Sequence, residues 1–271
     1  MTAATLEQLP WFAEHFEWFL AHKPRYASHV AHSATTGDHH RHLLSIVDPD
    51  RLRRVLEVML DEEEFLSPHG LRALAASHRE HPFTLHLDGI TASVDYEPGE
   101  STTAIFGGNS NWRGPVWFPV NYLLIESLHR FGEYLGDDFT VECPTRSGTL
   151  MSLHQVADDL TRRLVSIFLD DKDGRRPVFG DAERFQSDPL LHNLVPFHEY
   201  FHGDTAKGLG ASHQTGWTGL VADLVARRCA DGVPCIDASA DQAAPAAAAT
   251  RPSTSSGAPT PSTTTTIPAS S

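Results

Sequence analysis

Two segments combine aromatic rings with polar groups in a way that suits the binding of a sugar. The first spans residues 107–122, GGNSNWRGPVWFPVNY, in which Trp112 and Trp117 flank Arg113. Flat aromatic faces contact the C–H side of a sugar ring, and fixed polar groups such as Arg113 and Asn121 bind its hydroxyls. A buried tryptophan pair with Arg113 in an ion pair would account for the same residues, so both interpretations stay open.

The second segment, residues 197–220, reads FHEYFHGDTAKGLGASHQTGWTGL and surrounds Glu199 with aromatic and histidine side chains. Its glycines allow the backbone to turn tightly and to approach a ligand closely. A carboxylate in such a frame suits general acid or base catalysis. The alternative is that Glu199 only ties down a loop through contacts with arginine or backbone groups.

The histidines raise the question of a metal site. His198 and His202 are spaced i, i+4, but H-E-x-x-x-H departs by one residue from the zinc-protease pattern H-E-x-x-H. We favour a loop-shaping role for His198, His202 and His213, with metal binding there or at residues 39–42 as the lesser alternative. DDKDG at 170–174 has too few calcium ligands and predicts a turn. We therefore expect no metal and no organic cofactor.

The bulk composition excludes some classes of partner. A net charge of -14 over 271 residues repels phosphate backbones, so we expect no nucleic-acid partner. No apolar run approaches the length of a membrane span, and the N-terminus lacks the basic start of a signal peptide. We therefore expect no membrane partner. Three cysteines form no disulfide framework, which indicates a reduced, cytoplasmic setting, with a local Cys229–Cys235 loop as the lesser alternative.

Helical spacing of apolar residues predicts a mainly α-helical domain over residues 1–236. Asp48 with Pro49, and Ser152 with Gln155, have the residue types of helix N-termini. We expect loops over 25–46 and 81–111, with a short hairpin near Ile90. The tail, residues 237–271, is so rich in Ala, Pro, Ser and Thr that we predict disorder. About six helices are predicted, near residues 9–22, 49–60, 67–75, 117–135, 153–168 and 215–228.

Several stretches of this sequence resemble glycoside hydrolase family 63, in its bacterial glucosidase-like branch. They are FLSPHGLRALAASHREHPF, VDYEPGES, the long block that begins GGNSNWRGPVWFPVNYLLIESL, RRPVFGD, and PFHEYFHGDTAKGLGASHQTGWTGLVADL. The resemblance covers roughly residues 1–228. It implies an (α/α)6 barrel and inverting hydrolysis of α-glucosidic bonds in oligosaccharides or glycosylated small molecules.

The same resemblance implies roles for individual residues. Glu199 matches the general base of the family. The remaining matched positions would bind the substrate: the WRGPVW segment, Asn121 on the helix that follows it, and the block that closes the site after the base. These residues are Trp112, Arg113, Gly114, Trp117, Asn121, His213, Gln214 and Trp217.

The chain also departs from the family pattern. An inverting glycosidase needs two carboxyl groups on opposite sides of the bond, and the family's general acid is an Asp in the first half of the barrel, which has no counterpart here. Asp95, Glu97 and Glu100 are the nearest acids, but their loop context looks structural. We therefore expect the C-terminal portion of a barrel, from a truncated gene, a misplaced start, or a two-chain enzyme with an N-terminal half-barrel partner. A non-catalytic carbohydrate-binding or interaction fragment, or a remnant without function, are the alternatives.

Overall fold

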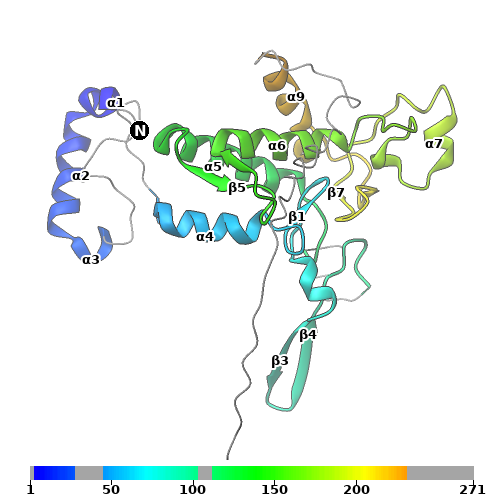
Figure 1. Cartoon of the computed structure of the whole chain (residues 1–271), viewed down its shortest axis with the longest axis horizontal. Coiled ribbons are helices and arrows are strands. Elements are labelled where there is room, and N and C mark those ends of the chain that lie inside the picture. The colour runs from blue at the N-terminus through cyan, green and yellow to red at the C-terminus, as the bar shows by residue number, and fades with distance from the viewer. Residues whose placement is uncertain (1–2, 28–44, 103–111, 231–271) are drawn as a thin grey trace, which may run out of the picture. The chain divides into compact units, whose positions relative to one another are not determined.

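The computed structural model describes residues 3–27, 45–102 and 112–230, and this part of the chain is mainly helical (Figure 1). None of its helices is both long enough and apolar enough to cross a membrane. The α-helices are α1 (Ala3–Gln8), α2 (Pro10–His22), α3 (Pro24–Ala27), α4 (Pro49–Met59), α5 (Phe118–Leu135), α6 (Leu153–Ser166), α7 (Glu183–Ser187), α8 (Thr215–Thr218) and α9 (Val221–Ala230), with short 3-10 helices η2 (Ala76–Arg79) and η3 (Pro177–Phe179).

Short antiparallel hairpins connect these helices. Each sheet described has two strands that are neighbours in the sequence, so long-range strand pairing adds little to the fold. The pairs are β1 (Leu66–Ser67) with β2 (Gly70–Leu71), β3 (Phe83–Leu87) with β4 (Ile90–Val94), β5 (Thr140–Glu142) with β6 (Leu150–Ser152), and β7 (Tyr200–Phe201) with β8 (Gly208–Leu209).

The core lies where α5 and α6 pack side by side, with α4 and α9 against them (Figure 1). Leu153, Val156, Leu160 and Leu164 follow one another at helical spacing along α6, and all four are fully buried. Such a stripe turns one face of the helix toward its neighbours, and its burial from water is the main stabilising force. The predicted helices at 117–135 and 153–168 are confirmed.

Two predicted helix starts are also confirmed. Asp48 accepts a hydrogen bond of 2.8 Å from the Arg51 amide at the start of α4. Ser152 and Gln155 form a capping box at the start of α6, in which each side chain binds the other residue's backbone amide. These bonds satisfy amides that the first helical turn leaves unpaired.

The predicted short helix near residues 67–75 is wrong. Residues 66–71 instead form the β1–β2 hairpin, in which Ser67 Oγ donates to the Gly70 carbonyl at 2.8 Å. Gly70 has a φ of +125°, and an added Cβ would lie 2.9 Å from the Leu164 side chain. Only glycine fits there, so the apolar spacing marks a buried turn. A 3-10 helix, η2, follows at Ala76–Arg79.

The other expectations have mixed outcomes. The hairpin near Ile90 is confirmed as β3–β4, with Asp88 and Gly89 both at positive φ in its turn. The single last helix is wrong, because α8 ends before Gly219 and α9 begins at Val221. Most of the expected 25–46 loop and the whole tail from 237 lie outside the described residues.

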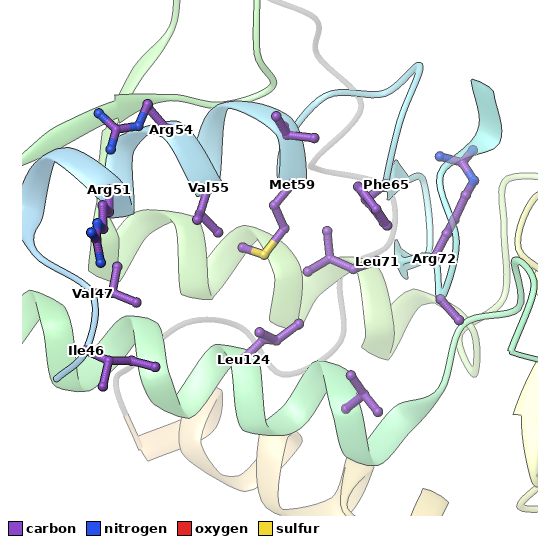
Figure 2. Close-up of a pocket in the computed structure, with 13 residues that line it drawn as sticks. Ile46, Val47, Arg51, Arg54, Val55, Met59, Phe65, Leu71, Arg72 and Leu124 are labelled. Carbon is purple, nitrogen blue, oxygen red and sulfur yellow. The ribbon is translucent and has the colours of Figure 1, made fainter. Parts of the chain in front are cut away.

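An apolar groove of about 780 Å³ lies between α4 and α5 (Figure 2). Val55 and Val58 of α4 and Val120 of α5 line it, and about half of each side chain is exposed. Arg51 and Arg54 stand beside these valines. The groove thus leaves apolar faces of two core helices uncovered by the described residues. Its other lining residues are Ile46, Val47, Met59, Phe65, Leu71, Arg72, Ala73 and Leu124.

Candidate active site

The WRGPVW segment leads into α5 and forms an antiparallel bridge with β7. Val116 pairs with Phe201 through two backbone hydrogen bonds of 2.8 and 3.0 Å. This pairing brings the neighbours Trp117 and Tyr200 together. Gly114 has a φ of +140°, and a Cβ there would lie 2.5 Å from the Tyr96 ring. Only glycine therefore fits at this position.

Four aromatic rings form one group, which we call the aromatic platform: Trp112, Trp117, Tyr200 and Trp217. Trp117 stacks between Trp112, at 4.2 Å between ring centroids, and Tyr200, at 4.7 Å. Trp217 of α8 tilts against Trp117 at 5.6 Å. Trp117 and Tyr200 are buried, whereas Trp112 is 42% exposed and Trp217 39% exposed. The platform therefore has a buried centre and two rings accessible from solvent.

Arg113, next to Trp112 in the sequence, has a side chain that is only 2% exposed. Its guanidinium donates to Asp95 Oδ1 at 2.9 Å, to the Glu97 carboxylate and to Ser101 Oγ at 3.1 Å. Buried charges are stable when they are paired and hydrogen-bonded in this way. The predicted ion pair of Arg113 is confirmed, but the tryptophan pair is only half buried because Trp112 is exposed. Sugar binding by this motif stays a prediction.

Glu199 is half-buried directly before β7. Its backbone amide donates to the Ala211 carbonyl at 2.9 Å, and its Oε2 accepts from the Ala211 amide at 3.2 Å. A Cβ added to Gly210 would lie 2.8 Å from Glu199 Oε2 and 2.7 Å from Tyr200 Cε1. The carboxylate and the edge of the aromatic platform therefore meet at this glycine.

The block that follows β8 runs back along the residues before Glu199. The Gln214 amide donates to the Phe197 carbonyl at 2.6 Å, and Thr218 Oγ1 donates to the His198 carbonyl at 2.5 Å. His213 is exposed, and its ring stacks on Phe197. The structure thus brings Trp217 to the platform and lines up His213 and Gln214 beside the segment that carries Glu199.

Asn121 is buried, and its side-chain amide is engaged with the backbone. Its Oδ1 accepts from the Leu71 amide at 2.7 Å, and its Nδ2 donates to the carbonyls of Leu71 and Trp117, both at 3.0 Å. Asn121 therefore joins β2 to the start of α5, directly behind Trp117.

A polar network that the sequence did not reveal is centred on Asp204, in the turn between β7 and β8. Asp204 accepts hydrogen bonds from Tyr96 at 2.8 Å, from Arg72 at 3.3 Å and from Arg79 at 2.7 Å. Burial alone would raise the pKa of Asp204, but the Tyr96 hydroxyl and the two arginines hold it below its usual range. Asp204 lies more than 100 residues after its three partners, so no local spacing in the sequence predicted these contacts.

His198 and His202, on either side of Glu199 and β7 in the sequence, are partly buried. Burial lowers the pKa of His198 and of His202, which favours neutral imidazoles near pH 7. His202 Nδ1 accepts hydrogen bonds from the backbone amides of Asp204 and Thr205, at 3.2 and 3.3 Å. Within residues 3–27, 45–102 and 112–230, no three His, Cys, Asp or Glu side chains gather as metal ligands would.

Known proteins of two yeasts are similar to this chain in sequence. Over 234 residues the chain is 44% identical to an uncharacterized protein of Saccharomyces cerevisiae, which covers 85% of this chain and 21% of that protein. Over 179 residues it is 25% identical to a probable mannosyl-oligosaccharide glucosidase of Schizosaccharomyces pombe, covering 66% of this chain and 16% of the relative. The chain thus spans about a fifth of the length of these curated relatives.

The family assignment rests on a match to a family model that covers more than half of the chain. Residues 41–218 match the model of the mannosylglycerate hydrolase MGH1-like glycoside hydrolase domain, and this range contains the aromatic platform, Arg113 and Glu199. The chain therefore belongs to the family of MGH1-like glycoside hydrolase domains.

Proposed function

We propose that Glu199 is the general base of an inverting glycosidase site. One observation carries this proposal: the Glu199 carboxylate and the Tyr200 edge of the aromatic platform meet at Gly210, within 2.8 and 2.7 Å of a Cβ built there. A sugar stacked on the platform would bring its anomeric carbon near the carboxylate. Glu199 would then take a proton from the water that attacks this carbon.

The substrate that we propose is an α-glucosidic bond in an oligosaccharide or a glycosylated small molecule. The name of the S. pombe relative, a mannosyl-oligosaccharide glucosidase, supports the oligosaccharide. The family description, mannosylglycerate hydrolase, names a glycosylated small molecule and so supports that class of substrate. Both classes present one terminal sugar ring to a binding surface.

The proposed substrate-binding residues divide by exposure. Trp112 and Trp217 are open to solvent, which supports direct stacking on the sugar. His213 is also exposed and would bind a hydroxyl. The other five would shape the surface from behind, because they are buried or use their backbone in the fold. These are Arg113, Gly114, Trp117, Asn121 and Gln214.

We further propose that the general acid comes from outside the described residues. Asp95 and Glu97 both pair with Arg113, which supports a structural role for them. The chain would then be the C-terminal part of an (α/α)6 barrel of family 63, in its bacterial glucosidase-like branch. A partner chain with the N-terminal half-barrel would supply the acid.

A substrate whose leaving group needs no proton separates the two halves of this proposal. Fluoride leaves unaided, so the chain should hydrolyse α-glucosyl fluoride but not glucosylated oligosaccharides. Glu199→Gln should lower fluoride release by about 100-fold or more. Glu80→Gln, an exposed glutamate distant in sequence, is the matched control. Equal release by the Glu199 variant would refute the base, and turnover of oligosaccharides would refute the missing acid.

A second candidate function is a non-catalytic carbohydrate-binding or interaction fragment that requires a partner chain. The apolar groove between α4 and α5 favours it, because uncovered apolar faces of this kind mark interaction surfaces (Figure 2). Sugar binding that is lost in Trp217→Ala but kept in Glu199→Gln, with no fluoride release by the unmodified chain, would support this function over catalysis.

A further inference from the structure

Glu100 hydrogen-bonds to both arms of the β7–β8 hairpin, which directly follows the proposed base Glu199. The Tyr200 hydroxyl of β7 donates to Glu100 Oε2 at 2.7 Å, and the Gly210 amide, just after β8, donates to Glu100 Oε1 at 3.2 Å. Both carboxylate oxygens thus accept hydrogen bonds from the β7–β8 hairpin. Tyr200 directly follows Glu199, so one of these bonds acts on the neighbour of the base.

The two glutamates bind consecutive amides of one turn. Gly210 donates to Glu100, and Ala211 donates to Glu199 Oε2 at 3.2 Å. Adjacent backbone nitrogens lie less than about 4 Å apart, so the carboxylates converge on two consecutive peptide units. Gly210 has a φ of +66° and no Cβ to block either contact. A shift of this turn would therefore move the Glu199 carboxylate.

The bond from Tyr200 has a second consequence. Its side chain is fully buried, and a buried hydroxyl without an acceptor is costly. Glu100 supplies this acceptor from an exposed position. The Tyr200 ring stacks on Trp117, so its orientation affects the centre of the aromatic platform. Glu100 thus contacts the turn that binds the base and the ring that supports the proposed sugar surface.

We propose that Glu100 is a positioning residue: it holds Tyr200 and the Gly210–Ala211 turn so that the Glu199 carboxylate faces the aromatic platform. This role rests on the proposed function of Glu199. It differs from that of a substitute general acid, because Glu100 acts through its neighbours and donates no proton to the substrate.

Amide hydrogen exchange of the full chain tests the contact without any need for turnover. In Glu100→Ala, both acceptor oxygens are lost, and the amides of Gly210 and Ala211 should exchange about tenfold faster or more. The Gly210 amide loses its own acceptor, whereas the Ala211 amide changes only if Glu199 has moved. Glu80→Ala should change neither. Faster exchange at Gly210 alone, or at neither amide, would overturn the positioning role.

Release of fluoride from α-glucosyl fluoride gives the second readout. Glu100→Ala should lower kcat about tenfold and change KM by less than about threefold, because it misaligns the base and leaves the exposed Trp112 and Trp217 in place. Tyr200→Phe should lower kcat similarly, and the double variant should lose little more, since both act through one contact. A large rise in KM with unchanged kcat would contradict this role. If Glu199→Gln kept full turnover, the proposed function would fail while the exchange result stood.

Discussion

The α5–α6 core and the loops around Glu199 are stabilised by different forces. Helix α6 buries a stripe of leucine and valine side chains against α5, and no single contact dominates. Around Glu199, single directed contacts fix the chain, such as those of Arg113 with Asp95 and of Asp204 with Tyr96. Apolar packing spreads its cost over many neighbours, whereas each directed bond depends on one partner. Damage to the core should therefore affect stability, and damage to the loops should affect the site.

A cavity in the core should have the largest effect on stability. Leu160 of α6 is fully buried, so Leu160→Ala should lower the free energy of unfolding by about 2–5 kcal/mol. Urea denaturation measures this loss. Leu190→Ala, at a side chain that is 82% exposed, should change it by less than about 0.5 kcal/mol. If the folded Leu160 variant lost sugar binding, the separation between core and site would be wrong.

A buried histidine near the core should make stability depend on pH. Burial, with the charges of Arg163 and Arg72, lowers the pKa of His69 from 6.5 to about 4. The unfolded chain therefore takes up this proton at higher pH than the folded chain. The contribution to stability is full above pH 6.5 and is lost as the pH falls toward 4, by at most about 3 kcal/mol.

Unfolding measured across this range in His69→Gln should show a flatter dependence on pH. His81→Gln, at an exposed histidine, is the control and should keep the slope of the unmodified chain. An unchanged slope in His69→Gln would assign the dependence to other groups.

A substitution at Gly114, which lies against the Tyr96 ring, should affect both the stability of the fold and the proposed site. Gly114→Ala should cost about 1–3 kcal/mol, because the Cβ meets the Tyr96 ring and the backbone has a φ of +140°. Gly148→Ala has a positive φ of +76° but open space, so it isolates the backbone cost. We expect Gly114→Ala alone to weaken sugar binding as well. Equal effects of the two variants would show that the Tyr96 contact is unimportant.

Removal of an exposed platform ring should have the smallest effect on stability. Trp112→Ala should lower it by no more than about 1 kcal/mol, since one face of this ring is already open. The affinity for a glucoside should fall about tenfold, measured by calorimetric titration. Trp11→Ala, at a ring of α2 that is 70% exposed, should leave the affinity unchanged.

The sequence predicted the helical core better than the connections within it. The i, i+3, i+4 stripe of α6 and the capping box at Ser152 are local patterns with one structural meaning. Residues 66–71 show apolar residues as well, but the close approach of Gly70 to α6 decides for a hairpin. That approach is a tertiary contact, which local spacing does not encode.

The candidate site was predicted in part for a similar reason. The Trp112–Trp117 pair and Glu199 lie in compact motifs, which made them visible as candidates. The contacts of Glu100 with Tyr200 and Gly210 join residues that are 100 and 110 positions apart, so no local sequence pattern predicts them. The buried positions of Arg113 and Asn121 likewise follow from packing, which residue type alone does not reveal.

The anomer released from α-glucosyl fluoride tests the role of Glu199 most directly. Proton NMR during early turnover should show β-glucose first, because water activated by the base attacks from the face opposite the leaving group. Glu199→Gln should remove this signal while the variant keeps its fold. First release of α-glucose, or an equal rate of β-glucose release by the variant, would contradict the assignment of Glu199 as the general base.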